Sequence, residues 1–329
     1  MSTIVTNNQS NNDGNWAIIG LGRIAASHVD ALAQRPNRPL VAVVETDLAR
    51  AAKGAELGAQ VFGTIGAMLA EVPISRAIVC TPPHLHPAQV TELLQHGVAT
   101  LVEKPLALSQ TLAQRLVDLA HSTGCVLQTA AKFAATESIR TAGKLIAAGK
   151  IGNVVKIENV FSGPLDVRGD WRSIPEQAGG GVLFDNGPHV VDVVRTLVGL
   201  PSSIRVLHVG YKQGTGVEDE VEFELRTAPG IVTHSVLSWN EAKPAPIARV
   251  VGTLGELVVG WQRLECVVGD TTEVVGGGYD KRAAFVNIHD DFENAIAEKQ
   301  KPQNYGVLGI ALMEAGIRSF TSKQWESPL

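Results

Sequence analysis

The stretch that decides the fold is Trp16-Ala-Ile-Ile-Gly-Leu-Gly-Arg-Ile-Ala25. Its first five residues have the pattern of a buried strand, and a helical pattern follows the glycines as far as Leu32. In the turn between them, Gly20 permits a sharp bend and Gly22 lets the backbone approach a pyrophosphate, while Ala25 lets helix and strand pack closely. The helix start then offers free N–H groups to phosphates. The stretch predicts a dinucleotide-binding unit.

An acidic residue stands where such a unit needs one. Residues 39–45 form a second apolar strand that ends in Glu45. A carboxylate at this point can accept hydrogen bonds from both hydroxyls of the adenosine ribose, and its charge repels a 2′-phosphate. We therefore predict NAD as the cofactor. NADP stays open, because Arg23 and Arg50 are near enough in sequence to help bind a phosphate.

Strands with apolar residues on both faces alternate with amphipathic helices as far as about residue 131. This alternation is typical of a parallel sheet covered by helices on both sides. Residues 16–131 are therefore predicted to form a doubly wound Rossmann domain. Its expected strands are 16–20, 39–45, 60–62, 76–81, 100–103 and 125–129.

The pattern changes after about residue 150. In residues 219–226, apolar and charged side chains alternate strictly, which is typical of a strand with one buried and one solvated face. Residues 132–329 are therefore predicted to form an α/β domain with an open, largely antiparallel sheet. Its last helices, at about 287–298 and 306–322, are free to pack back on the first domain. Further strands are expected at 154–161, 231–239, 247–252, 256–259 and 264–268.

Length and composition limit the class of protein. A chain of 329 residues has room for two domains, and a net charge of −5 gives no footprint for nucleic acid or an anionic membrane. Residues 1–15, rich in Asn, Ser and Thr, are expected to be a flexible tail and have the pattern of neither a signal peptide nor an anchor. Cys80, Cys125 and Cys266 lack zinc spacing. We expect a cytoplasmic protein with buried thiols and no metal.

Two rigid turns follow neighbouring strands at the edge where ligands bind. In Thr81-Pro82-Pro83-His84-Leu85-His86 the prolines fix a crossing of the cofactor, and either histidine could touch its nicotinamide half. The histidine pair lacks a third ligand at metal spacing. In Glu103-Lys104-Pro105, the lysine can point into the cleft as a hydrogen-bond donor. The alternative is an ordinary exposed lysine at a strand end.

A glycine-rich helix start provides a second chemical group. Gly179-Gly-Gly-Val-Leu-Phe-Asp-Asn-Gly-Pro-His-Val-Val-Asp192 places Asp185 and His189 four residues apart, on one face of a helix. Pro188 predicts that this helix begins close to Asp185, because proline is tolerated in a first turn. A carboxylate beside an imidazole can orient it for proton transfer near neutral pH. The alternative is an Asp cap with a histidine on the first turn.

Together, Glu103-Lys104-Pro105, the upstream Thr-Pro-x-x-x-His and the Gly-Gly-Gly-x-x-x-Asp-x-Gly-x-His-x-x-Asp stretch resemble the Gfo/Idh/MocA family (glucose–fructose oxidoreductase, inositol dehydrogenase and rhizopine catabolism proteins). The resemblance runs from about residue 16 to the C-terminus. It implies NAD(P)-dependent oxidation or reduction of a secondary alcohol or carbonyl on a sugar, cyclitol or sugar nucleotide. It also implies a homodimer or homotetramer formed through the open sheet.

The resemblance assigns the catalytic residues. His189 would exchange the hydroxyl proton, Asp185 would orient the imidazole, and Lys104 would donate a hydrogen bond to the reacting oxygen. Three positions are implied as substrate contacts: Lys132, where members often carry an arginine before an aromatic residue, and the Trp171-Arg172 segment. The expected cofactor-binding residues are Gly20, Gly22, Arg23, Ile24, Glu45, Thr81, Pro82, His86 and Glu103.

Two other functions fit the same motifs. A non-catalytic NAD(P)-binding regulatory protein would use the fold for sensing, and a hydrolase or lyase would use the cofactor only in a transient redox step. A last motif, His289-Asp290-Asp291, is interpreted as the cap of the helix expected at about 287–298, because acidic residues complement the dipole at a helix start.

Overall fold

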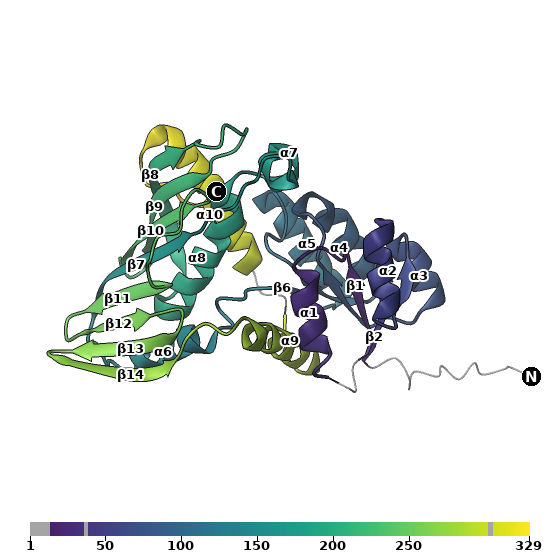
Figure 1. Ribbon diagram of the computed structural model, residues 1–329, viewed down its shortest axis with the longest axis horizontal. Coiled ribbons are helices and arrows are strands. Elements are labelled where there is room, and N and C mark those ends of the chain that lie inside the picture. Colours follow the sequence, from purple (N-terminus) through teal and green to yellow (C-terminus); the bar gives the residue numbers. More distant parts are fainter. Residues whose placement is uncertain (1–13, 36–38, 302–304) are drawn as a thin grey trace, which may run out of the picture.

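The computed structural model describes residues 14–35, 39–301 and 305–329, so the expected tail lies outside the described residues up to position 13 (Figure 1). Its first sheet has six parallel strands in the order β3-β2-β1-β4-β5-β6. This is the predicted doubly wound arrangement. The strands are β1 (Trp16–Ile19), β2 (Leu40–Val44), β3 (Gln60–Phe62), β4 (Arg76–Val79), β5 (Ala99–Val102) and β6 (Leu127–Thr129).

Helices cover both faces of this sheet because its strands are apolar on both sides. Side chains that prefer N-cap positions start three of them: Asp47, Thr64 and Ser109 each accept a hydrogen bond from the backbone N–H three residues on. The helices are α1 (Ala25–Leu32), α2 (Leu48–Glu56), α3 (Ile65–Glu71), α4 (His86–Gln95) and α5 (Gln110–Thr123).

Helix α9 (Lys281–Ala297), far along the chain, also belongs to this packing. It lies beside α1, and its Phe285 and Phe292 join the core around Trp16 (Figure 1). The helix begins six residues earlier than expected, capped by Asp280. The interpretation of His289-Asp290-Asp291 as a cap was therefore wrong, because these residues lie in mid-helix.

The second sheet has eight strands in the order β14-β13-β12-β11-β7-β10-β9-β8. Only β7 and β10 pair in parallel, which agrees with the predicted open, largely antiparallel sheet. The sequence patterns missed β8 and β14; most of β14 is exposed, so it has no buried period to detect. The strands are β7 (Val154–Ser162), β8 (Pro201–Gly210), β9 (Glu220–Thr227), β10 (Val232–Ser238), β11 (Ala248–Gly252), β12 (Glu256–Val259), β13 (Arg263–Val268) and β14 (Thr271–Gly277).

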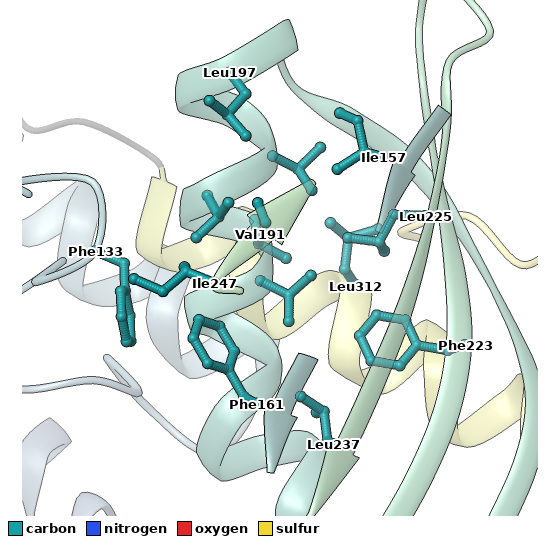
Figure 2. Close-up of a cluster of buried hydrophobic side chains, with 14 of the residues drawn as sticks. Phe133, Ile157, Phe161, Val191, Leu197, Phe223, Leu225, Leu237, Ile247 and Leu312 are labelled. Carbon is teal, nitrogen blue, oxygen red and sulfur yellow. The ribbon is translucent and has the colours of Figure 1, made fainter. Parts of the chain in front are cut away.

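Helix α8 (Val182–Val198) packs on this sheet and carries the predicted Asp185 and His189. Figure 2 shows Val191 and Leu197 from α8 among the apolar side chains of the strands. The remaining helices are α6 (Glu137–Ala147), α7 (Pro175–Ala178) and α10 (Tyr305–Ser322), with short 3₁₀ turns at Pro83–Leu85 and Trp171–Ser173. Within the described ranges, no helix combines the length and apolar character needed to cross a membrane.

The start of α8 is fixed by close packing. A Cβ atom on Gly181 would lie 1.8 Å from the carbonyl oxygen of Glu218, so no larger residue fits there. The Glu218 carboxylate accepts hydrogen bonds from the backbone N–H groups of Gly181 and Leu183, which have no partner within the helix. Asp185 therefore lies in the first turn, as expected. Pro188 does not, because the helix begins at Val182 and encloses it.

Candidate active site

A cleft of about 590 Å³ lies between the C-terminal edge of the first sheet and the start of α8. It gathers residues from distant parts of the chain, and every predicted site residue except His86 lines it. Those lining residues are Gly20, Gly22, Arg23, Ile24, Glu45, Thr81, Pro82, Glu103, Lys104, Lys132, Trp171, Arg172, Asp185 and His189.

The glycine turn forms one wall of the cleft. Gly20 has a φ of +86°, and a Cβ atom there would lie 2.7 Å from Cγ2 of Thr81, so both conformation and space require glycine. Gly22 faces the cleft with no atom closer than 3.7 Å to a built Cβ. The chain can therefore turn sharply into α1 and present its backbone to a ligand.

Glu45 ends this wall as a fully hydrogen-bonded carboxylate. It accepts from the backbone N–H groups of Leu21, Thr46 and Asp47 at 2.8–2.9 Å, and from the Arg50 guanidinium at 3.0 and 3.1 Å. Burial alone would raise the pKa of Glu45, but the hydrogen bonds from Arg50, Asp47 and Leu21 outweigh it and lower the pKa to about 2. The carboxylate is charged at any physiological pH, with Arg50 held against it.

Lys104 crosses the cleft and joins the two sheets. It follows β5, and its Nζ donates to the backbone oxygen of Asp185 at 2.7 Å and to the Asp185 carboxylate at 2.5 Å. An ammonium group has three N–H donors, so one remains for a ligand. Burial would raise the pKa of Asp185, but the charge and hydrogen bond of Lys104 outweigh it and keep the pKa low. Lys104 is thus an anchored donor, not an exposed lysine.

His189 does not have the partner that the sequence suggested. The prediction that Asp185 orients the His189 imidazole was wrong. The Asp185 carboxylate instead accepts a hydrogen bond from Lys104, which follows a strand of the first sheet. His189 instead lies 5.0 Å from the Phe133 ring and 6.2 Å from the Phe161 ring, and its buried Nδ1 has no hydrogen-bond partner in the described part of the chain. Burial and the nearby charges of Lys132 and Lys104 hold the pKa of His189 well below its usual value. The ring is neutral at pH 7.

The predicted substrate contacts Lys132, Trp171 and Arg172 line the cleft together with Lys104 and His189. Burial, followed by repulsion from Lys104, lowers the pKa of Lys132 to about 8. Arg172 donates to Asp170 at 2.9 Å, and its guanidinium lies 4.5 Å from the centre of the Trp171 ring. All three predicted contacts therefore face the cleft beside Lys104 and His189.

The prediction that His86 binds the cofactor is corrected by its position. It is fully buried, and its ring nitrogens lie 2.9 Å from the carbonyl oxygen of Pro105 and 2.8 Å from that of Thr81. It therefore holds the two cleft turns together from behind and does not itself line the cleft. Its neighbour His84 is exposed and is also absent from the lining.

A buried chain of two histidines lies behind the cleft residue Glu103. His28 on α1 contacts Glu103, and His289 on α9 contacts His28. The sequence patterns did not indicate His28 and assigned His289 to a helix cap, because no motif joins their positions in the sequence. In residues 14–35, 39–301 and 305–329, no group of three or more His, Cys, Asp or Glu side chains could hold a metal ion.

Comparison with known families agrees with this architecture. Residues 14–131 match the GFO/IDH/MocA model described as an oxidoreductase family with an NAD-binding Rossmann fold, and residues 139–258 match the GFO/IDH/MocA C-terminal domain. The chain belongs to the Gfo/Idh/MocA family. Its first sheet is therefore the NAD-binding Rossmann fold of this family, and the resemblance in the sequence motifs is confirmed.

Curated relatives match different lengths of this chain. An uncharacterised oxidoreductase of Schizosaccharomyces pombe is 30% identical over 154 residues, which are 46% of this chain and only 42% of the relative. A longer match is to a Streptomyces antibioticus enzyme, dTDP-3,4-didehydro-2,6-dideoxy-alpha-D-glucose 3-reductase. The two are 28% identical over 296 residues, which are 86% of this chain and 88% of the relative.

A solved structure resembles the whole molecule. Levoglucosan dehydrogenase in complex with NADH and levoglucosan superposes with a TM-score of 0.87, covering 96% of this chain and 99% of the other, at 22% identity. At this identity the likeness shows a shared fold.

Proposed function

We propose that the protein is an NAD-dependent oxidoreductase that transfers hydride between nicotinamide and a secondary alcohol or carbonyl of a sugar-like substrate. One observation carries the proposal: Lys104, anchored on Asp185, lies with neutral His189 in the cleft that Gly20 and Glu45 line. A hydrogen-bond donor and a proton acceptor thus share one space with the features of a dinucleotide site.

The residues present fit NAD. Gly20 and Gly22 leave the backbone open at the start of α1, where a pyrophosphate would bind, and the charged Glu45 lines the same cleft after β2, where it would hold the adenosine ribose. The Glu45 carboxylate favours ribose hydroxyls over a 2′-phosphate, and we propose NAD as the physiological cofactor with NADP as a weaker alternative. The bound nicotinamide would supply or accept the hydride.

The side chains of the cleft would handle the proton and the charge on the reacting oxygen. The third N–H of Lys104 would donate to that oxygen and stabilise the negative charge that develops on it. His189 would accept the hydroxyl proton at Nε2 in oxidation and return it in reduction, which requires the neutral tautomer with its proton on the buried Nδ1. Lys132, Trp171 and Arg172 would contact the remaining hydroxyl groups and fix which carbon faces the nicotinamide.

The proposed substrate class rests on the relatives. The Streptomyces antibioticus relative is named as a reductase of a dTDP-sugar, and the structural neighbour is named as a dehydrogenase in complex with levoglucosan, an anhydrosugar. We propose a sugar, cyclitol or sugar nucleotide with a free secondary hydroxyl or keto group. Cytoplasmic location and a homodimer or homotetramer stay predictions.

A screen of polyols, anhydrosugars and keto-sugars with NAD, NADH, NADP and NADPH tests the proposal through absorbance of the reduced cofactor. We expect turnover with at least one sugar-like substrate, and a loss of about 10²–10⁴-fold in His189→Ala. Tight NADH binding without turnover would support a regulatory protein. Product formation without net change in NADH would support a hydrolase or lyase with transient redox.

A further inference from the structure

A buried chain of three polar side chains runs from the cleft to α9. The Oε1 atom of Glu103 lies 3.0 Å from Nε2 of His28, and Nδ1 of His28 lies 2.9 Å from Nε2 of His289. Both histidines are fully buried, and Glu103 is 7% exposed where it lines the cleft. The chain joins the end of β5, α1 and α9.

The hydrogen bonds in the chain all point toward Glu103. The carboxylate accepts the Nε2–H of His28, which leaves Nδ1 of His28 to accept the Nε2–H of His289. The Nδ1 atom of His289 is buried with no partner in the described part of the chain. It therefore carries the lone pair rather than the proton, because a buried N–H without an acceptor is rarer than an unpaired acceptor. Burial and the neighbouring His28 and Arg35 keep the pKa of His289 low, which agrees with a neutral ring.

The ring planes are held by stacking. His289 stacks on Trp16 with ring centres 5.2 Å apart, whereas the His28 and His289 rings lie edge to edge with only 11° between their planes, as an in-plane N–H···N hydrogen bond requires. The edge of His28 also meets the Phe285 ring at 4.8 Å. These aromatic contacts leave the imidazoles little freedom to rotate, so the direction of each hydrogen bond is fixed by packing.

The far end of the chain holds the backbone of the proposed hydrogen-bond donor. The second oxygen of Glu103 accepts the backbone N–H of Lys104 at 3.2 Å. Lys104 extends from this point across the cleft to Asp185. We propose that His28 and His289 are positioning residues, which fix Glu103 and through it the reach of the Lys104 ammonium group.

Core filling alone does not explain the chain. Burying a carboxylate and two imidazoles costs free energy unless each hydrogen-bonding group is satisfied, whereas apolar side chains would fill the same volume without that cost. The polar chain differs from an apolar core because hydrogen bonds are directional. The Glu103 carboxylate can accept from both His28 and the Lys104 backbone only in one orientation. The inference rests on the proposed function, since it gives Lys104 a role in the reaction.

A set of His289 variants tests the inference. His289→Phe retains a ring that can stack on Trp16 and removes the donor to His28, whereas His289→Gln retains an N–H donor. We expect kcat to fall about tenfold in H289F, with the KM for NAD changed by less than about twofold, and to recover largely in H289Q. His289→Met is a second donor-free variant for the case that H289F does not fold.

The matched control is Phe292→Leu, one turn along α9. Phe292 packs against Trp16 in the same core and has no hydrogen-bonding group that could join the chain. We expect F292L to lower Tm as H289F does but to leave kcat unchanged. If the donor-free variants lose only Tm and keep kcat, the chain is structural and the inference fails.

A readout without activity separates this inference from the proposed function. In protein labelled with ¹⁵N-histidine, we expect two downfield, slowly exchanging ring protons, from Nε2 of His28 and Nε2 of His289, and the loss of the second in H289F. Two such protons in a protein that turns over no substrate would overturn the proposed function and leave the chain intact. Their absence from the wild-type spectrum would overturn the chain itself.

Discussion

The two ends of the cleft satisfy their polar groups in different ways. At the Glu45 end, the carboxylate has five hydrogen bonds, all donated by residues between Leu21 and Arg50. At the other end, the groups come from separate segments around Lys104, Lys132 and Asp185, and Nδ1 of His189 has no hydrogen-bond partner among the described residues.

This difference between the two ends agrees with cofactor binding at the Glu45 end and proton transfer at the Lys104 end. A carboxylate held by five donors keeps one position and its charge, and a ribose would bind it by taking the place of the Arg50 guanidinium. By contrast, the third N–H of Lys104 and the neutral ring of His189 are left for a substrate. The end of the cleft proposed to react is the end that the protein leaves incompletely satisfied.

The largest effect is expected from removing the anchored donor. Lys104→Met should lower kcat by about 10²–10⁴-fold, because the proposed donor to the reacting oxygen is lost. Steady-state kinetics with titration of NADH binding measure this, since the cofactor should still bind. Lys281→Met, at the start of α9 and outside the cleft lining, is the control. Equal kcat in the two variants would show that the reacting end does not depend on Lys104.

A smaller effect is expected at the satisfied end. Glu45→Gln should lower kcat/KM for NAD by about 10–100-fold and raise it for NADP, because the charge that favours ribose hydroxyls is lost and Arg50 is released. Asp47→Asn is the control, since it removes a nearby charge and can still cap α2. An unchanged ratio of NAD to NADP in Glu45→Gln would contradict the role of this end in cofactor choice.

The motifs were strongest where partners lie close in the sequence. Gly20 and Glu45 could be placed because strand, turn and acid occur within one βαβ unit, so local rules determine their positions. The partner of Asp185 could not, because the i,i+4 spacing with His189 says nothing about a lysine that arrives from another sheet. His86 was misplaced for a similar reason: a histidine beside a ligand-binding edge can face the cleft or the loop behind it.

Some strands and helix contacts could not be predicted from the sequence for related reasons. The alternation of β9 was visible because one face is buried, whereas β14 is largely exposed and has no such signal. The chain from Glu103 to His289 depends on α9 packing beside α1, a contact that no local pattern encodes.

A third test sharpens the comparison through pH. With a pKa of about 8, Lys132 is charged below pH 8 and neutral above it. If its ammonium group contacts the substrate, KM should rise as the pH passes through about 8, and Lys132→Met should raise KM about tenfold and abolish that rise. Lys144→Met, on α6 and outside the cleft lining, serves as the control. A wild-type KM that does not change between pH 7 and 9 would remove Lys132 from the substrate contacts.

The smallest expected effect is on stability. The pKa of His189 lies below its unfolded value of about 6.5, so the unfolded state binds protons first as pH falls. The contribution of His189 to the free energy of unfolding is therefore fully present above about pH 6.5 and is lost as the pH falls below that value. Tm should fall by roughly 1–2 °C per pH unit on account of this group. His189→Phe should flatten the decline, whereas Phe161→Leu, beside it, should lower Tm equally at every pH. Parallel curves for wild type and His189→Phe would disprove the assignment.

The position of α9 has a consequence for how the protein is made. One face of the first sheet is covered by α1 and α9, and α9 begins only at Lys281. As the chain leaves the ribosome, residues 16–131 emerge long before the helix that buries their apolar face. The nucleotide-binding half therefore completes its core near the end of translation, and a fragment that stops at residue 131 would expose that face to aggregation.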